Sequence, residues 1–132
     1  MSESTPAWVV AGVRAVIGAH TQAQDEGRTD DIVALYESEA VLELPGTDPV
    51  TGHDAIRATF KGWAPTQPQQ HLVTNTAVTA TSEDGATAVS DVVFFQRVGA
   101  AWAPLVVGRY EDTFRHANGA WLFQRRVTTF QT

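Results

Sequence analysis

The spacing of apolar residues changes near Trp63, and this change constrains the fold more than any other feature of the chain. Before Trp63 the apolar residues recur every three or four positions, which is the period of an amphipathic helix. After Trp63 they alternate with polar residues, which is the period of a half-buried strand. Helices grouped first and strands grouped after them predict an α+β fold, with the helices packed on one face of a curved sheet.

Three helices are expected in the first half. The first follows Pro6, which suits an opening turn, and ends near Gly27. Its apolar stripe consists of Val9, Val13, Val16, Ile17 and His20. The second helix is predicted from Asp31 to Tyr36, and the third spans residues 52–63.

A short strand is predicted over Val41–Leu44, followed by a turn-rich loop over Pro45–Gly52. Four longer strands are expected at 71–81, 87–98, 104–116 and 120–130. Asn118-Gly119 between the last two is a strong signal for a type I′ hairpin. The strands therefore predict a mostly antiparallel sheet, and the 132 residues together (1–132) predict a single domain.

Composition excludes several classes of partner and site. The net charge is −6, with 15 acidic and 9 basic residues, which argues against nucleic acid as a partner. The chain has no cysteine, so disulfides and thiolate metal sites are excluded. Residues 1–6 lack the basic start of a signal peptide, and no apolar run approaches the roughly 20 residues that span a bilayer. We expect a cytoplasmic protein with no membrane partner.

Several polar side chains fall on the predicted inner face of the sheet. Successive residues of a strand point to opposite faces. This places His71 and Asn75 inside from one strand, and Tyr110 and Asp112 inside from another. Burying such a group without a partner costs about 1–3 kcal/mol. A cavity that accepts a ligand would relieve this cost.

His71 is a candidate general acid or base, because histidine takes up and releases protons near neutral pH. Asp25 falls at the C-terminal end of the first helix, where the helix dipole disfavours an anion, so it needs a partner. His71 is the candidate partner. The alternatives are a histidine bonded to a backbone carbonyl and a solvated aspartate.

Other polar or aromatic residues leave two interpretations open. Tyr110 could donate a hydrogen bond to a substrate carbonyl, whereas Asp112 could instead hold strands together. His20, on the apolar helix stripe, is either a satisfied core residue or a pocket donor. Trp63 is either part of the pocket mouth or a packing anchor.

Four segments carry a family resemblance. They are Gly27-Arg28-Thr29-Asp30-Asp31-Ile32-Val33-Ala34-Leu35-Tyr36, Glu39-Ala40-Val41, Gly52-His53-Asp54-Ala55-Ile56-Arg57 and Gly119-Ala120-Trp121. Together with the order of elements, they resemble the SnoaL-like branch of the nuclear transport factor 2-like superfamily. The resemblance implies a cone-shaped sheet capped by helices, the cystatin-like roll. Its pocket serves isomerases, dehydratases, cyclases and epoxide hydrolases, and also non-catalytic binders.

Two relatives differ in how well their catalytic residues match. For ketosteroid isomerase, the positions of the helical tyrosine, the base and the second acid hold His20, Leu44 and Gly108, so none is retained. For scytalone dehydratase, the catalytic histidine and helical aspartate match His71 and Asp25.

The second histidine of scytalone dehydratase falls near Gln96 and its strand asparagine at Tyr110, while its helical tyrosine becomes Gln24. Half of that constellation is therefore replaced.

These observations predict a cofactor-free lyase or isomerase for a small, mostly apolar, oxygenated molecule. The alternative is a binding protein of the same fold without chemistry. The predicted catalytic residues are His71, Asp25 and Tyr110. The predicted substrate-binding residues are His20, Asn75, Asp112, Leu44, Phe94, Gln96 and Trp63.

No metal is expected, because the four histidines lack ligand spacing. We expect a homodimer through the outer sheet face, where Arg97 and Arg115 alternate with apolar residues. A protein–protein adaptor would instead need a large exposed apolar patch.

Overall fold

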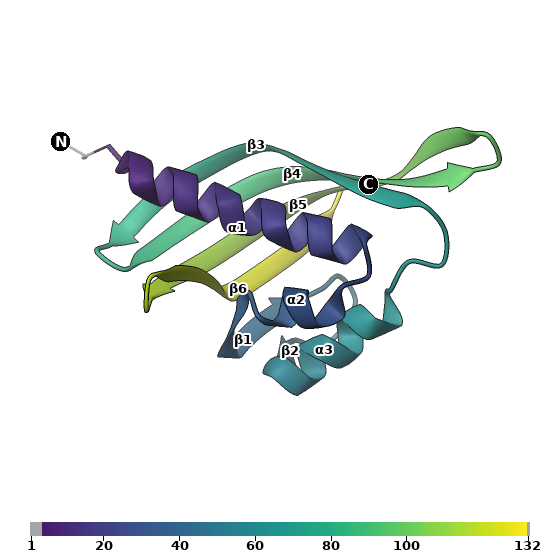
Figure 1. Ribbon diagram of the computed structural model, residues 1–132. Coiled ribbons are helices and arrows are strands. Elements are labelled where there is room, and N and C mark those ends of the chain that lie inside the picture. The colour runs from purple at the N-terminus through teal and green to yellow at the C-terminus, as the bar shows by residue number, and fades with distance from the viewer. Residues whose placement is uncertain (1–3, 132) are drawn as a thin grey trace.

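Three helices pack on a six-stranded mixed sheet, which confirms the predicted α+β class (Figure 1). The computed structural model describes residues 4–131, and residues 1–3 and 132 of the predicted domain lie outside the described residues. The elements are α1 (Ala7–Asp25), α2 (Thr29–Val33), β1 (Tyr36–Glu43), β2 (Val50–Thr51), α3 (His53–Gly62), β3 (Gln69–Ser82), β4 (Gly85–Val98), β5 (Ala101–Ala117) and β6 (Ala120–Phe130).

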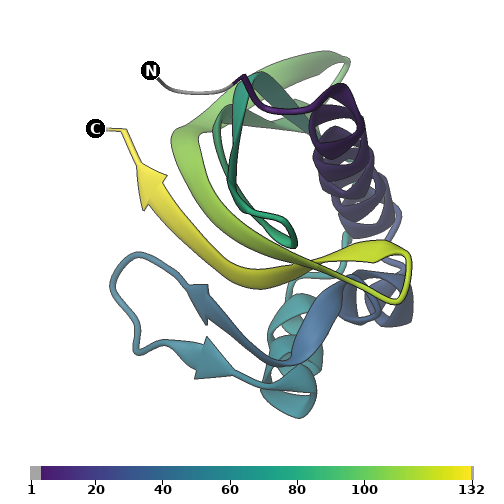
Figure 2. The same ribbon diagram turned by 90° about the vertical axis from the view of Figure 1, so that its left-hand side faces the viewer.

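The strand order is β2-β1-β6-β5-β4-β3, and every neighbouring pair is antiparallel except β1 with β6. The predicted turn between β5 and β6 is present, because Asn118 and Gly119 both have positive φ, at 53° and 81°. Figure 2 shows the sheet bending into an arc, with α1 across its open side.

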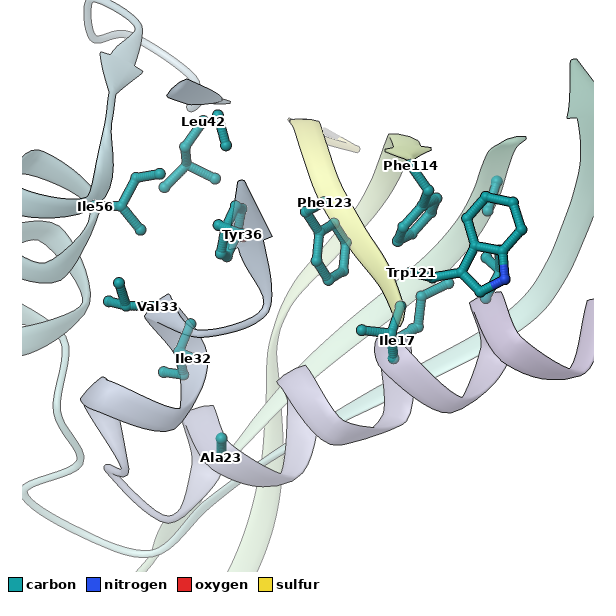
Figure 3. Close-up of a cluster of buried hydrophobic side chains, with 14 of the residues drawn as sticks. Ile17, Ala23, Ile32, Val33, Tyr36, Leu42, Ile56, Phe114, Trp121 and Phe123 are labelled. Carbon is teal, nitrogen blue, oxygen red and sulfur yellow. The ribbon is translucent and has the colours of Figure 1, made fainter. Parts of the chain in front are cut away.

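The core lies between α1 and the inner face of the sheet. All five residues of the predicted helix stripe are buried, as is Ala23 in the last turn of the helix. Phe114, Phe123 and Trp121 face Ile17 of α1 in the close-up of Figure 3. No helix within residues 4–131 is both long enough and apolar enough to cross a membrane.

The predicted second helix is wrong at its C-terminal end. It ends at Val33, and Tyr36 begins β1, which is longer than the predicted 41–44. The reason is pairing with β6: Tyr36 lies opposite Phe123, whose backbone N–H donates to the Leu35 carbonyl at 2.8 Å. Such pairing is not local, so the helical spacing of 31–36 could not reveal it.

The predicted loop over 45–52 contains the short strand β2, because Val50 pairs with Leu42. The long strands also begin earlier than predicted, at Gln69, Gly85 and Ala101, because pairing continues to the ends of the hairpins.

Two bulges change which residues face inward. In β3 the register shifts between Thr74 and Ala77, and Asn75 has a φ of 55°. In β6 the shift leaves Gln124 as an extra residue, because Thr113 pairs with Arg125 while Phe114 pairs with Phe123. A bulge reverses the inward and outward positions that follow it. The inner faces of β3 and β6 therefore differ from strict alternation.

We predict that Gly12→Ala destabilises the protein. A Cβ at Gly12 would lie 2.6 Å from Cδ1 of Trp121, so either the buried Trp121 ring or α1 would have to shift. Overpacking of this kind costs about 1–3 kcal/mol, which exceeds the gain of roughly 1 kcal/mol in helix propensity. Denaturant unfolding measures the change.

The matched control is Gly18→Ala in the same helix. Nothing lies within 4 Å of a Cβ at Gly18, so this variant gains the propensity without a clash. Equal stabilities of the two alanine variants would contradict the packing argument.

Candidate active site

A pocket of about 340 Å³ lies between the C-terminal half of α1, α3 and the inner face of the sheet. Seven of the ten predicted site residues line it: His20, Leu44, Trp63, His71, Phe94, Gln96 and Tyr110. The remaining wall is largely apolar, with Phe60, Val92 and Phe130 among its side chains. The hollow that the sequence predicted beneath the helices is therefore present.

Asp25 and His71 are in contact, as their sequence positions suggested. His71 Nδ1 lies 2.6 Å from Asp25 Oδ1, and the His71 backbone N–H donates to Oδ2 at 2.7 Å. Gln69 Nε2 donates to the same carboxylate at 3.1 Å. These three donors offset the unfavourable position of an anion in the last turn of α1. They also join the end of α1 to the edge strand β3.

The contact with Asp25 determines how the His71 ring can act. A carboxylate accepts hydrogen bonds, so Nδ1 carries the proton and Nε2 has the free lone pair. Nε2 makes no hydrogen bond within residues 4–131, and it is not among their fully buried unpaired atoms. The ring packs on Phe94, 4.6 Å between centroids. His71 therefore presents a proton acceptor to the pocket.

Tyr110 is buried on the inner face of β5, as predicted, and lines the pocket. Its hydroxyl makes no hydrogen bond to another described residue and is not fully enclosed. Burial raises the pKa of Tyr110, so the hydroxyl keeps its proton. It can donate a hydrogen bond to a ligand oxygen.

His20 lines the pocket, but its ring nitrogens are poorly placed to donate a hydrogen bond to a ligand. Its Nε2 lies 2.8 Å from the Tyr36 hydroxyl, and its Nδ1 is buried without a partner among residues 4–131. Phe60 and Phe123 pack edge-on around the ring. Burial lowers the pKa of His20 well below its ordinary value, with the nearby Arg126 charge contributing. The side chain is therefore a neutral wall residue.

Asn75 does not reach the pocket, so its predicted role is wrong. The bulge in β3 turns it outward, where its Nδ2 donates to Asp91 at 2.9 Å. Thr76 takes the inward position, with its hydroxyl 2.9 Å from that of Ser90.

Asp112 is inward-facing as predicted, but it does not line the pocket. It accepts two hydrogen bonds from Arg126, from Nε at 2.8 Å and from Nη2 at 3.0 Å. Burial raises the pKa of Asp112, and the Arg126 charge opposes this rise. The predicted substrate-binding role of Asp112 is therefore wrong, because Asp112 is the partner of Arg126. The two hydrogen bonds join β5 to β6, in line with the alternative interpretation that Asp112 holds strands together.

Arg126 is the functional candidate that the sequence analysis missed. It is 2% exposed and lines the pocket, and its Cζ lies 3.7 Å from the centroid of the Tyr110 ring. Burial lowers the pKa of Arg126, but the charge and hydrogen bonds of Asp112, together with Tyr110 and Tyr36, raise it above its ordinary value overall. Removing one partner of such a buried pair typically costs about 3–5 kcal/mol.

The sequence held a partial signal for this pair. An inward aspartate needs a cationic partner, and the Asn118-Gly119 hairpin brings residues 125 and 126 opposite Asp112. Strict alternation from Phe123 would have placed Arg125 inside. The bulge at Gln124 makes Arg126 the inward residue instead.

Gln24, Thr66, Gln69 and Thr128 are further polar residues of the pocket wall that were not predicted as site residues. Within residues 4–131 no group of three or more His, Asp or Glu side chains is arranged to hold a metal ion.

The family model of the SnoaL-like domain matches residues 7–127 of this chain. The chain belongs to the SnoaL-like domain family. This confirms the resemblance drawn from the sequence. A comparison with curated proteins gave no match.

Solved structures from Novosphingobium aromaticivorans share the SnoaL-like fold. A candidate aromatic ring hydroxylase is 25% identical to this chain. The match covers 98% of this chain and 93% of the hydroxylase chain, with a TM-score of 0.85. A candidate scytalone dehydratase is 21% identical, with coverages of 93% and 84% and a TM-score of 0.83. A nuclear transport factor 2-like protein with a cystatin-like fold is 22% identical, with coverages of 93% and 82% and a TM-score of 0.83. The last two similarities show the fold alone.

We predict that His20 makes stability depend on pH. The folded protein holds it neutral, whereas the unfolded chain protonates it below about pH 6.5. The contribution of His20 to the free energy of unfolding is therefore fully present above about pH 6.5. It is lost as the pH falls, by up to about 1.4 kcal/mol per pH unit.

Urea unfolding of wild type and His20→Gln between about pH 8 and about pH 5 tests this. The wild-type free energy of unfolding is expected to fall more steeply with decreasing pH than that of the variant. Parallel curves would show that His20 does not titrate on unfolding.

Proposed function

We propose that this SnoaL-like protein is a cofactor-free lyase or isomerase that moves a proton on a small, oxygenated, mostly apolar molecule. The observation that carries the proposal is the contact between His71 Nδ1 and Asp25 at 2.6 Å, which leaves Nε2 of this pocket-lining residue without a partner among the described residues. A pocket for binding alone has no need of a basic nitrogen oriented by a carboxylate. The candidate scytalone dehydratase of the same fold is consistent with this class of reaction.

In the proposed mechanism, His71 Nε2 removes a proton from a carbon next to a carbonyl group. Asp25 holds the ring and stabilises the imidazolium that forms. Tyr110 donates to the carbonyl oxygen as it becomes an enolate, and such donors contribute several kcal/mol in a dry site. His71 then returns the proton, either to another carbon or to a departing hydroxyl group. The first outcome is isomerisation and the second is dehydration, and neither requires a cofactor.

The aromatic and aliphatic walls, which include Leu44, Phe94 and Trp63, would hold the apolar body of the substrate. Gln96, a polar residue of the wall, would contact its polar substituents.

Deuterium incorporation from D2O into a panel of enolisable cyclic ketones and hydroxyketones tests the proposal. We expect exchange by the wild type, and a loss of about a hundredfold to ten-thousandfold in His71→Gln, because glutamine cannot take up the proton. Asp25→Asn is expected to lose at least about tenfold, because the ring is no longer held with Nε2 unprotonated.

His116→Gln is the matched control, because His116 packs between Trp8 and Trp121, away from the pocket wall. Exchange that survives in His71→Gln would reject the assignment of the base. Binding of these compounds without exchange by the wild type would favour the non-catalytic alternative.

We also propose that the outer sheet face pairs with a second copy of the chain. Leu72 lies opposite Val93, which lies opposite Val107, so three strands place apolar side chains in one outward row. Leu72 and Val107 are 45% and 49% exposed, and Arg97 on β4 and Arg115 on β5 are also exposed.

We expect the wild type to sediment as a dimer and Val107→Asp as a monomer, because the aspartate would be buried without a partner. Val98→Asp is the control, since Val98 lies at the end of the β4–β5 hairpin and outside this row. A wild-type protein that stays monomeric at high concentration would contradict the proposal.

A further inference from the structure

The edge of the Arg126 guanidinium that is not bound to Asp112 is available to a ligand. Asp112 occupies the edge formed by Nε and Nη2. Nη1 makes no hydrogen bond to any described residue, and it is not among their fully buried unpaired atoms. Because Nη1 and Nη2 each carry two hydrogens, two parallel N–H groups remain on the second edge. Arg126 is one of the residues that line the pocket.

The surroundings hold the guanidinium in place. Its Cζ lies over the rings of Tyr110, at 3.7 Å, and Phe123, at 4.7 Å. The two bonds to Asp112 fix the orientation of the plane. A planar fork that is already oriented loses little side-chain entropy when it binds a second partner.

The charges around the pocket favour an anion at this edge. Arg126 is the one permanently charged side chain among the described residues that line the pocket. Asp112 is bound at the other edge of the guanidinium, and Asp25 is not part of the wall, with its oxygens already occupied by three hydrogen bonds from His71 and Gln69. A negative ligand group would therefore meet a cation in surroundings that are otherwise mostly apolar.

We propose that Arg126 binds a carboxylate of the substrate through its free edge, so that the pocket takes oxo- or hydroxycarboxylic acids with an apolar body. The two parallel N–H groups match the two oxygens of a carboxylate. This inference rests on the proposed function for the reaction, in which the carboxylate on Arg126 would set which carbon faces His71. Binding itself does not depend on that reaction.

Isothermal titration with naphthoate and with its neutral isostere naphthamide tests the inference. We expect the wild type to bind naphthoate about tenfold or more tightly than naphthamide, because charge-assisted hydrogen bonds are stronger than neutral ones. The double variant Arg126→Met/Asp112→Leu removes the fork without leaving a buried charge unpaired. It is expected to lose this preference while it keeps its affinity for naphthamide.

Arg126→Lys provides a second variant that keeps a charge beside Asp112 but lacks the fork, and we expect it to lose most of the preference too. Circular dichroism is the control that checks whether each variant is folded. Equal binding of the two ligands by the wild type, or an unchanged preference in folded variants, would overturn the carboxylate assignment.

His71→Gln separates this inference from the proposed function. We expect it to keep the preference for naphthoate while it loses deuterium exchange. Loss of exchange with retained preference supports both proposals. A preference for naphthoate in a wild type that exchanges no proton of the ketones or of oxocarboxylic acids supports the carboxylate site and rejects the chemistry.

Discussion

The hydrogen bonds between Asp25 and strand β3 are the interaction on which the site depends. A carboxylate in the last turn of a helix is unfavourable alone, because it faces the negative end of the helix dipole. Here it accepts bonds from the His71 backbone, the His71 ring and Gln69, and so joins α1 to the sheet edge. The same contacts orient the imidazole toward the pocket. One carboxylate thus closes the fold and prepares the candidate base.

The second determinant is a pair of bulges in strands on opposite sides of the site. Each adds a residue that breaks the alternation of faces, in β3 beside Asn75 and in β6 at Gln124. The first moves an amide out of the pocket, and the second brings a guanidinium in. A buried arginine–aspartate pair is weak evidence for stability, because both ions lose their hydration. Here the pair fixes the position of Arg126, because Asp112 binds one edge of the guanidinium and leaves the edge formed by Nη1 and Nη2 without a partner among the described residues.

The pocket therefore has two chemically different groups within mostly apolar walls. His71 supplies a proton acceptor, and Arg126 supplies a cation with Tyr110 packed beneath it. The SnoaL-like fold brings the arc of the sheet and the covering helices, while in the proposed function these side chains carry the chemistry. Relatives of similar structure carry names as different as a candidate hydroxylase and a candidate dehydratase, so the fold alone does not fix the reaction.

The sequence by itself determined the features that depend on local periodicity. The stripe of α1, the alternation along β5 that puts Tyr110 inside and the turn at Asn118-Gly119 were all predicted correctly. The need of Asp25 for a partner also follows from its place in a helix. Tertiary structure alone decided that Tyr36 begins a strand, that Asn75 faces out and that Arg126 faces in. These outcomes depend on pairing between distant strands, and a single extra residue in that pairing exchanges the two faces.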